Sequence, residues 1–193
     1  CMAASLAACG GSASSAATDA SSAASTEAAT SEATEATGTS ANGFTVQLGS
    51  NPETLDPALN SAIDGANTLI TVFEPLLLID QNNEVIPGQA DLPEVSEDGL
   101  TWTFTMKDGL KWSDGSDLTA KDFEYSFKRL AAPDTAAPYA ETVVGMIDGY
   151  EDAIGNPDAD GNTTTDPDWD ALNVHASEDG KTLTIQLAYP CSY

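Results

Sequence analysis

Residues 10–43 contain no aromatic residue and no Leu, Ile, Val, Lys or Arg. Of these 34 residues, 25 are Ala, Ser or Thr, and the other nine are Gly, Asp, Glu or Asn. A segment without large apolar side chains cannot bury enough surface to offset the entropy that it loses on ordering. We therefore expect a disordered tether, which at roughly 5–6 Å × √n would span about 30 Å. Folding is left to the 150 residues from Phe44 onward.

The first nine residues are typical of the end of an export signal. Residues 1–8 are mostly small and apolar, and Leu6-Ala7-Ala8-Cys9 resembles the bacterial lipobox, in which the chain is cut just before the cysteine. Eight residues are also too few to span a bilayer. We predict that residues 1–8 are a signal-peptide remnant and that Cys9 carries the lipid of a lipoprotein tether, residues 9–43. The alternative is an Ala-rich terminus with a stray cysteine.

The charge and the cysteine count exclude several classes of protein. Six Lys and Arg against 31 Asp and Glu give a net charge of −25, which is wrong for binding nucleic acid or anionic lipid headgroups. Three cysteines and one histidine, with no C-x-x-C, do not make a disulfide framework, a zinc site or an iron–sulfur site. We predict no metal and no cofactor, and we interpret Cys191 as a small hydrophobe rather than a reactive thiol.

An alternating segment and an internal repeat predict a sheet. In residues 100–106, Leu100, Trp102, Phe104 and Met106 point one way and three threonines point the other. The turn sequence Ser-Glu-Asp-Gly precedes this segment at 96–99 and precedes a second alternating segment at 177–180. We expect two hairpins of one mixed sheet. Two further strands are predicted at 44–48 and, as a short buried strand, at 76–79.

Three helices are predicted. The clearest covers 120–130, where Thr119 is the N-cap and Asp122 lies favourably in the first turn. Phe123, Phe127 and Leu130 fall on one face of this helix and predict its buried side. The other two cover 66–73 and 140–147. Aromatic side chains on these packing faces are expected in the core: Trp102, Phe104, Trp112 and Phe127.

Six motifs, in their order and spacing, resemble one family. They are Pro52-Glu-Thr-Leu-Asp-Pro57, Ile86-Pro-Gly88, Val95-Ser-Glu-Asp-Gly-Leu-Thr-Trp-Thr-Phe104, Lys107-Asp-Gly-Leu-Lys-Trp-Ser-Asp-Gly115, Leu118-Thr-Ala-Lys-Asp122 and Tyr125-Ser-Phe-Lys-Arg129. Together they are similar to the N-terminal third of family 5 extracellular solute-binding proteins, the peptide-binding components of ABC importers. The stretch Pro133-Asp-Thr-Ala-Ala-Pro-Tyr-Ala140 resembles the oligopeptide branch most.

The resemblance implies an α/β fold of the periplasmic-binding-protein type, with two lobes that close on a ligand like a hinge. Residues 44–193 would be the N-terminal part of the solute-binding domain. They would hold only the start of the first lobe and its small mixed-sheet subdomain. The second lobe would lie beyond Tyr193, so the resemblance implies a fragment cut at both ends.

The resemblance also implies a function without catalysis. The whole protein would capture oligopeptides outside the membrane and deliver them to an ABC permease and its ATPase. It would be a monomer, held at the outer side of the cell membrane by its lipid alone, or periplasmic. Dipeptides, nickel complexes and sugars are the alternative ligands within the same class.

The register of the motifs assigns residues to the ligand. Four of them match a loop that faces the cleft and meets ligand mainly through backbone groups: Asn60, Ser61, Ala62 and Ile63. Such contacts suit peptides, because the main chain is common to every peptide sequence. Tyr139 matches a cleft tyrosine, whose ring can pack on a peptide while its hydroxyl bonds a carbonyl group. The alternative for Tyr139 is an ordinary aromatic side chain between layers.

Two other classes fit the sequence less well. An enzyme is disfavoured because the chain has no G-x-S-x-G, H-E-x-x-H or P-loop. A weak extracellular calcium-binding module is suggested by Asn156, Asp158, Asp160 and Gly161, which have calcium-loop spacing. Position 12 of that loop is Pro167 instead of the bidentate Glu, so an acidic solvated loop over 156–170 is the alternative. His175, on a predicted short strand, is expected to be structural or exposed.

Lipidation can be tested by fractionation. Expressed with its export signal in a bacterium, the protein should partition with membranes, because two acyl chains suffice for stable anchoring. The Cys9→Ala variant should move to the soluble fraction, whereas Cys1→Ala, in the removed segment, should behave like the wild type. Equal amounts of wild type and Cys9→Ala in the membrane fraction on immunoblots would contradict the prediction.

Overall fold

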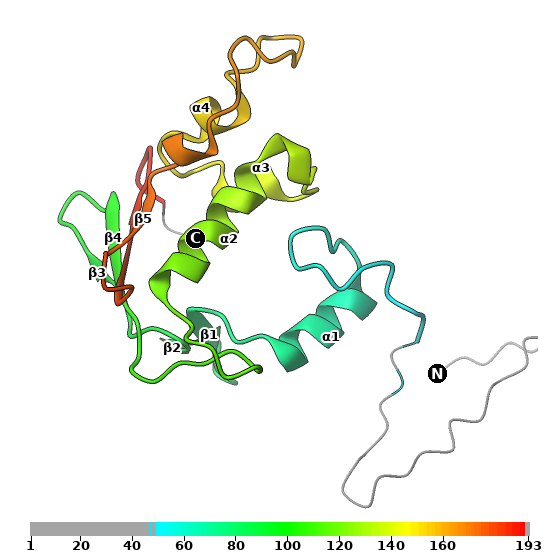
Figure 1. Ribbon diagram of the computed structural model, residues 1–193, viewed down its shortest axis with the longest axis vertical. Helices are drawn as coiled ribbons and strands as arrows, with labels where there is room; N and C mark the ends of the chain where they lie inside the picture. Colours follow the sequence, from blue (N-terminus) through cyan, green and yellow to red (C-terminus); the bar gives the residue numbers. More distant parts are fainter. Residues whose placement is uncertain (1–46, 48, 192–193) are drawn as a thin grey trace, which may run out of the picture. The chain divides into compact units, whose positions relative to one another are not determined.

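The computed structural model describes Gln47 and residues 49–191. The predicted signal remnant, the tether with Cys9 and all of the predicted strand 44–48 except Gln47 lie outside these residues and stay predictions. In chain order the described elements, shown in Figure 1, are α1 (Ile63–Val72), β1 (Leu77–Ile79), β2 (Val85–Pro87), β3 (Glu94–Val95), β4 (Thr101–Thr105), α2 (Ala120–Ala131), η1 (Pro133–Thr135), α3 (Ala140–Val144), α4 (Tyr150–Ile154), η2 (Trp169–Ala171), β5 (Val174–Ala176) and β6 (Thr182–Gln186).

The two Ser-Glu-Asp-Gly turns do form two hairpins of one sheet. The strand order is β3-β4-β6-β5, and the central ladder between β4 and β6 pairs Trp102 with Ile185. Every ladder described is antiparallel, where the sequence predicted a mixed sheet. Within the two hairpins the reason is the connection, because a short turn can join only antiparallel neighbours. The central strands β4 and β6 are far apart in the sequence and pair antiparallel as well. Strands β1 and β2 form a separate two-stranded sheet.

Helix α2 packs against the four-stranded sheet, and the core lies between them (Figure 1). The predicted N-cap is confirmed: the amide of Thr119 donates to the carboxylate of Asp122 at 2.8 Å. The predicted stripe is confirmed too, since Phe123, Phe127 and Leu130 pack against the core. The buried apolar residues come from α2, the sheet, α3, α4 and the segments that connect them: Ala90, Phe104, Met106, Ala120, Ala131, Val144, Ile147, Tyr150, Ala153, Leu172, Val174, Leu183, Ile185 and Leu187.

Three local predictions need correction. Trp112 is exposed rather than in the core, because it lies in a tight turn closed by its bond to Ser116. Strand β1 is only partly buried: Leu77 packs against the core, whereas Ile79 is exposed. The helix predicted over 140–147 ends earlier, at Val144, where the chain turns at Gly145 and Ile147 pairs with Leu187 instead.

The two repeated turns allow a matched test of how α2 is held on the sheet. Gly99 and Gly180 both have positive φ, at 74° and 70°. A Cβ on Gly180 would lie 2.9 Å from Thr119 Cβ, whereas the nearest atom to one on Gly99 is 3.9 Å away. Gly99→Ala should cost only the left-handed strain, about 1 kcal/mol. Gly180→Ala should cost at least about 1 kcal/mol more, because the helix start must shift. Urea unfolding measures both, and equal losses would contradict the prediction.

Candidate functional site

The loop that carries the predicted ligand residues is organised by Asp56. Its carbonyl accepts hydrogen bonds from the amides of Leu59 and Asn60, at 3.1 and 3.0 Å. Its carboxylate accepts a hydrogen bond from the amide of Ala58 at 3.0 Å. An Asp side chain that caps its own turn in this way selects one backbone conformation. The loop therefore has one defined path into α1.

The first turn of α1 provides room for the loop. The side chain of Asn60 donates to the carbonyl of Ala62 at 3.1 Å and lies over Gly65. A Cβ on Gly65 would lie 1.9 Å from Asn60 Oδ1, so only glycine leaves this space. Gly65 is the one described residue of α1 that is buried.

A second segment faces this loop. Helix α2 ends at Ala131, and η1 follows at once. Ala136 then takes a left-handed conformation, with φ of 50°. The chain passes through Pro138 to Tyr139, which is the N-cap of α3. The stretch that resembled the oligopeptide branch is therefore an irregular connection between two helices.

The loop and this segment line a hollow of about 470 Å³. Three of the five predicted ligand residues, Asn60, Ser61 and Ala62, lie in its wall. Ile63 and Tyr139 are both exposed and do not line it, although Tyr139 directly follows Pro138, which does. The complete lining is Glu53, Thr54, Leu59, Asn60, Ser61, Ala62, Ala136 and Pro138. Segments more than 70 residues apart in the sequence thus share one concave surface.

The loop presents two backbone donors. Ser61 and Ala62 are exposed, and within the described part of the chain neither amide donates to another group. Both residues line the hollow, and their N–H groups are adjacent in the chain. An extended peptide offers carbonyl oxygens along its length, so neighbouring donors of this kind can recognise its main chain.

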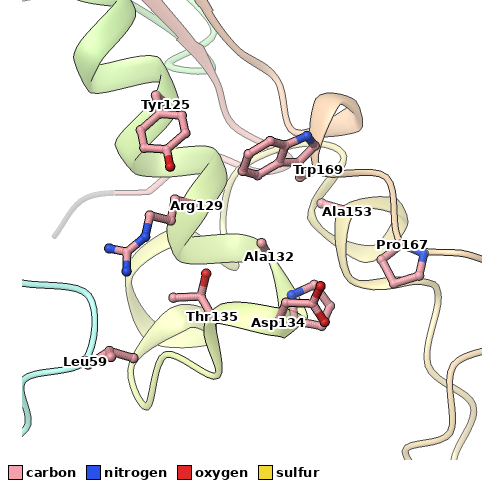
Figure 2. Close-up of a pocket in the computed structure, with 10 residues that line it drawn as sticks. Leu59, Tyr125, Arg129, Ala132, Asp134, Thr135, Ala153, Pro167 and Trp169 are labelled. Atoms are coloured by element: carbon pink, nitrogen blue, oxygen red, sulfur yellow. The ribbon is translucent and has the colours of Figure 1, made fainter. Parts of the chain in front are cut away.

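A larger neighbouring hollow, of about 660 Å³, opens beside α2 (Figure 2). Leu59 lines both hollows. Tyr125 and Trp169 form one side, with ring centroids 5.9 Å apart and an angle of 76° between the ring planes. Figure 2 shows Asp134 and Thr135 on the opposite side. Sequence reasoning did not assign Trp169 or Arg129 to this surface, although Arg129 lies within a family motif.

Arg129 joins α2, through Asp56, to the loop that carries the predicted ligand residues Asn60, Ser61 and Ala62, which is called the ligand loop below. Its Nη1 donates to Oδ1 at 2.9 Å and its Nη2 donates to Oδ2 at 2.6 Å, which is a two-pronged ion pair. The side chains are 34% and 28% exposed. The hydrogen bond from Arg129 lowers the pKa of Asp56. At pH values above the ordinary pKa of a carboxyl group, Asp56 is therefore ionised and the ion pair is formed. The ion pair is lost as the pH falls through the lowered pKa of Asp56.

Lys128, the preceding residue on α2, points to other partners. Its Nζ lies 2.8 Å from Glu124 and 3.0 Å from Asp170. Burial alone would lower the pKa of Lys128, but the bonds to these two carboxylates outweigh it and the pKa is raised. None of these three residues lines the hollow beside the ligand loop. Adjacent basic residues on α2 therefore serve different surfaces.

The suspected calcium loop is held by its own hydrogen bonds. The Asp158 carboxylate accepts from the amides of Asp160 and Asn162, both at 2.9 Å. Across Gln47 and residues 49–191, no group of three or more His, Cys, Asp or Glu could hold a metal ion. His175 is exposed on β5, and Cys191 packs against the core. None of the helices in the described ranges is long and apolar enough to cross a membrane.

Comparison with known proteins decides the family. Residues 84–192, more than half of the chain, match the model of "Bacterial extracellular solute-binding proteins, family 5 Middle". The chain belongs to this family. Among curated relatives, the periplasmic oligopeptide-binding protein OppA of Salmonella typhimurium is 36% identical over 146 residues, which are 75% of this chain and 25% of OppA. The oligopeptide-binding protein OppA of Bacillus subtilis is 35% identical over 149 residues, 77% of this chain and 25% of that protein.

Solved structures of the family have the same fold over the matched region. Haemophilus influenzae OppA, in complex with the peptide RPPGFSPFR, gives a TM-score of 0.65 at 29% identity and covers 76% of this chain. The predicted periplasmic-binding-protein-like fold is therefore confirmed. The chain spans about a quarter of the length of the relatives that it matches.

The contact between Asn60 and Gly65 can be tested by a double-mutant cycle. Gly65→Ala should destabilise the family 5 chain by about 1–3 kcal/mol, because the new Cβ displaces the Asn60 side chain. Asn60→Ala should cost less stability. The double variant should lose less stability than the two single losses added together, because the clash is then removed. Urea unfolding measures all three variants. Strict additivity would mean that the two residues do not meet.

Proposed function

We propose that this chain forms part of the substrate-binding component of an ABC importer, which captures oligopeptides outside the membrane and delivers them to the permease. The observation that carries the proposal is the hollow of about 470 Å³, which joins the ligand loop to the segment before α3. Ser61 and Ala62 lie in its wall, and within the described part of the chain their adjacent amides donate to no other group. Main-chain recognition of this kind suits ligands of varied sequence.

The relatives support the same ligand class. The two OppA proteins are oligopeptide-binding by name, and the Haemophilus structure contains a nine-residue peptide. We assign Asn60, Ser61 and Ala62 to direct ligand contact, with Ile63 and Tyr139 at the edge of the hollow. Tyr139 is about half exposed and has room to pack its ring on a peptide.

The setting of the proposed protein follows from its N-terminal sequence. We propose that it acts as a monomer, anchored on the outer side of the cell membrane through a lipid on Cys9 and the tether that follows. Its partners would be the permease and ATPase of the importer. It would bind its ligand without changing it, so no residue is assigned a catalytic role.

Tyr139 gives a test of the proposed contact. In the whole protein, Tyr139→Ala should weaken peptide binding by about 1–2 kcal/mol, a typical cost of removing an aromatic contact. Tyr189→Ala is the matched control: the two rings are 51% and 49% exposed, and Tyr189 does not line either hollow. Titration calorimetry with a peptide pool, and then with single peptides, measures the affinities.

Two outcomes would count against the proposal in different ways. If Tyr139→Ala and Tyr189→Ala bound peptide as tightly as the wild type, the assignment of Tyr139 would be wrong. If the wild type bound no peptide but bound nickel chelates, oligosaccharides or only dipeptides, the oligopeptide assignment would fail.

A further inference from the structure

We propose that Arg129 is a positioning residue for the peptide ligand: its ion pair with Asp56 fixes the ligand loop at the correct distance from the opposite wall of the hollow. The inference rests on the proposed function, since it concerns the same site. Arg129 does not line that hollow. It would act through Asp56 and through the loop that Asp56 organises.

The connectivity of the two walls supports this role. Between residues 49–62 and residues 120–139, the hydrogen bonds from Arg129 to Asp56 are the only ones described. Arg129 lies four residues before Pro133, which begins the segment that carries Ala136 and Pro138 of the opposite wall. The Arg129 side chain therefore links α2, which leads toward one wall of the hollow, with the turn at Asp56, which leads into the other wall.

The bonds of Asp56 carry this link to the ligand donors. The oxygens that bind Arg129 belong to the same residue whose carbonyl accepts from Leu59 and Asn60. Movement of Asp56 would therefore carry Asn60 with it, and the amide of Ser61 comes next in the chain. Adjacent donors recognise a peptide only if their spacing from the other contacts is kept.

The chemistry of the pair favours positioning over stabilisation. Both side chains are about one-third exposed, and ion pairs at such sites add little to overall stability. Two parallel hydrogen bonds to a planar guanidinium nevertheless fix the orientation of a carboxylate, which a lysine ammonium cannot do. The expected consequence of losing the pair is a displaced loop on a protein that stays folded.

Peptide titration of the whole protein tests the inference. Arg129→Lys, Arg129→Gln and Asp56→Asn should each weaken peptide binding about tenfold, and the double variant Asp56→Asn/Arg129→Gln should be no weaker than the single ones. The matched control is Lys128→Gln, which removes the neighbouring ion pairs of the same helix and should leave the affinity unchanged. Melting temperatures of all variants show whether they remain folded.

Hydrogen exchange of the 193-residue chain provides a measurement that does not depend on a peptide. In the wild type, the amides of Leu59 and Asn60 should be protected by the Asp56 carbonyl. Arg129→Lys should accelerate their exchange, whereas the amide of Gly180, bonded to Ser177 at the other end of α2, should exchange at the wild-type rate. Lys128→Gln should change neither rate.

The results separate this inference from the proposed function. If the wild type binds peptide and Arg129→Lys binds it equally well, Arg129 is not a positioning residue and the proposed function stands. If Lys128→Gln weakens binding as much as Arg129→Lys, the effect belongs to the charge of α2 and the inference fails. If the wild type binds no peptide, the proposed function fails and this inference with it. Loss of affinity together with faster exchange only in the Arg129 and Asp56 variants would support it.

Discussion

The packing of α2 against the four-stranded sheet is the constraint on which the rest of the described structure depends. One face of the helix places Phe123, Phe127 and Leu130 on the core. Its start is held by the bond from the Ala120 amide to the Gly180 carbonyl, at 2.8 Å. Its end leads directly into the wall of the candidate site. Arg129 therefore projects from a helix that is held on the core by its apolar face and at its start.

The few basic residues of this acidic protein are used to join distant segments. There are only six Lys and Arg against 31 Asp and Glu. The pairs of Arg129 with Asp56 and of Lys181 with Asp108 each connect residues 73 positions apart, and Lys121 donates to the carbonyl of Glu178. Several acidic side chains instead cap turns, as Asp80, Asp98 and Asp114 do. Local capping thus shapes the loops, and some of the scarce cations link segments that are distant in the sequence.

The sequence predicted elements well where local chemistry decides them. The cap at Thr119, the stripe of α2 and the two hairpins all follow from spacing and turn residues, and all are observed. Trp112 and Ile79 were misplaced because an apolar residue in a short segment does not reveal whether another layer covers it. The pair of Asp56 and Arg129 was not predicted, since both residues lie in family motifs but nothing local shows which distant side chain each one meets. Likewise the resemblance indicated the ligand loop, whereas only the fold shows that it shares a hollow with Ala136 and Pro138.

The support of backbone donors by an ion pair behind the loop has a physical reason. A binding protein that accepts many peptides cannot rely on side-chain complementarity, so its contacts are directed at the peptide main chain. A side chain can change its direction by changing its rotamer. A backbone amide cannot, because the direction of its N–H is set by the conformation of the whole loop. A loop of this kind therefore needs support from outside itself, and in this chain the Asx turn at Asp56 and the guanidinium of Arg129 are the groups in position to give it. The proposed specificity for peptides and the ion pair behind the loop are thus two parts of one requirement: backbone donors that serve every peptide ligand must be held in place by side chains behind the loop.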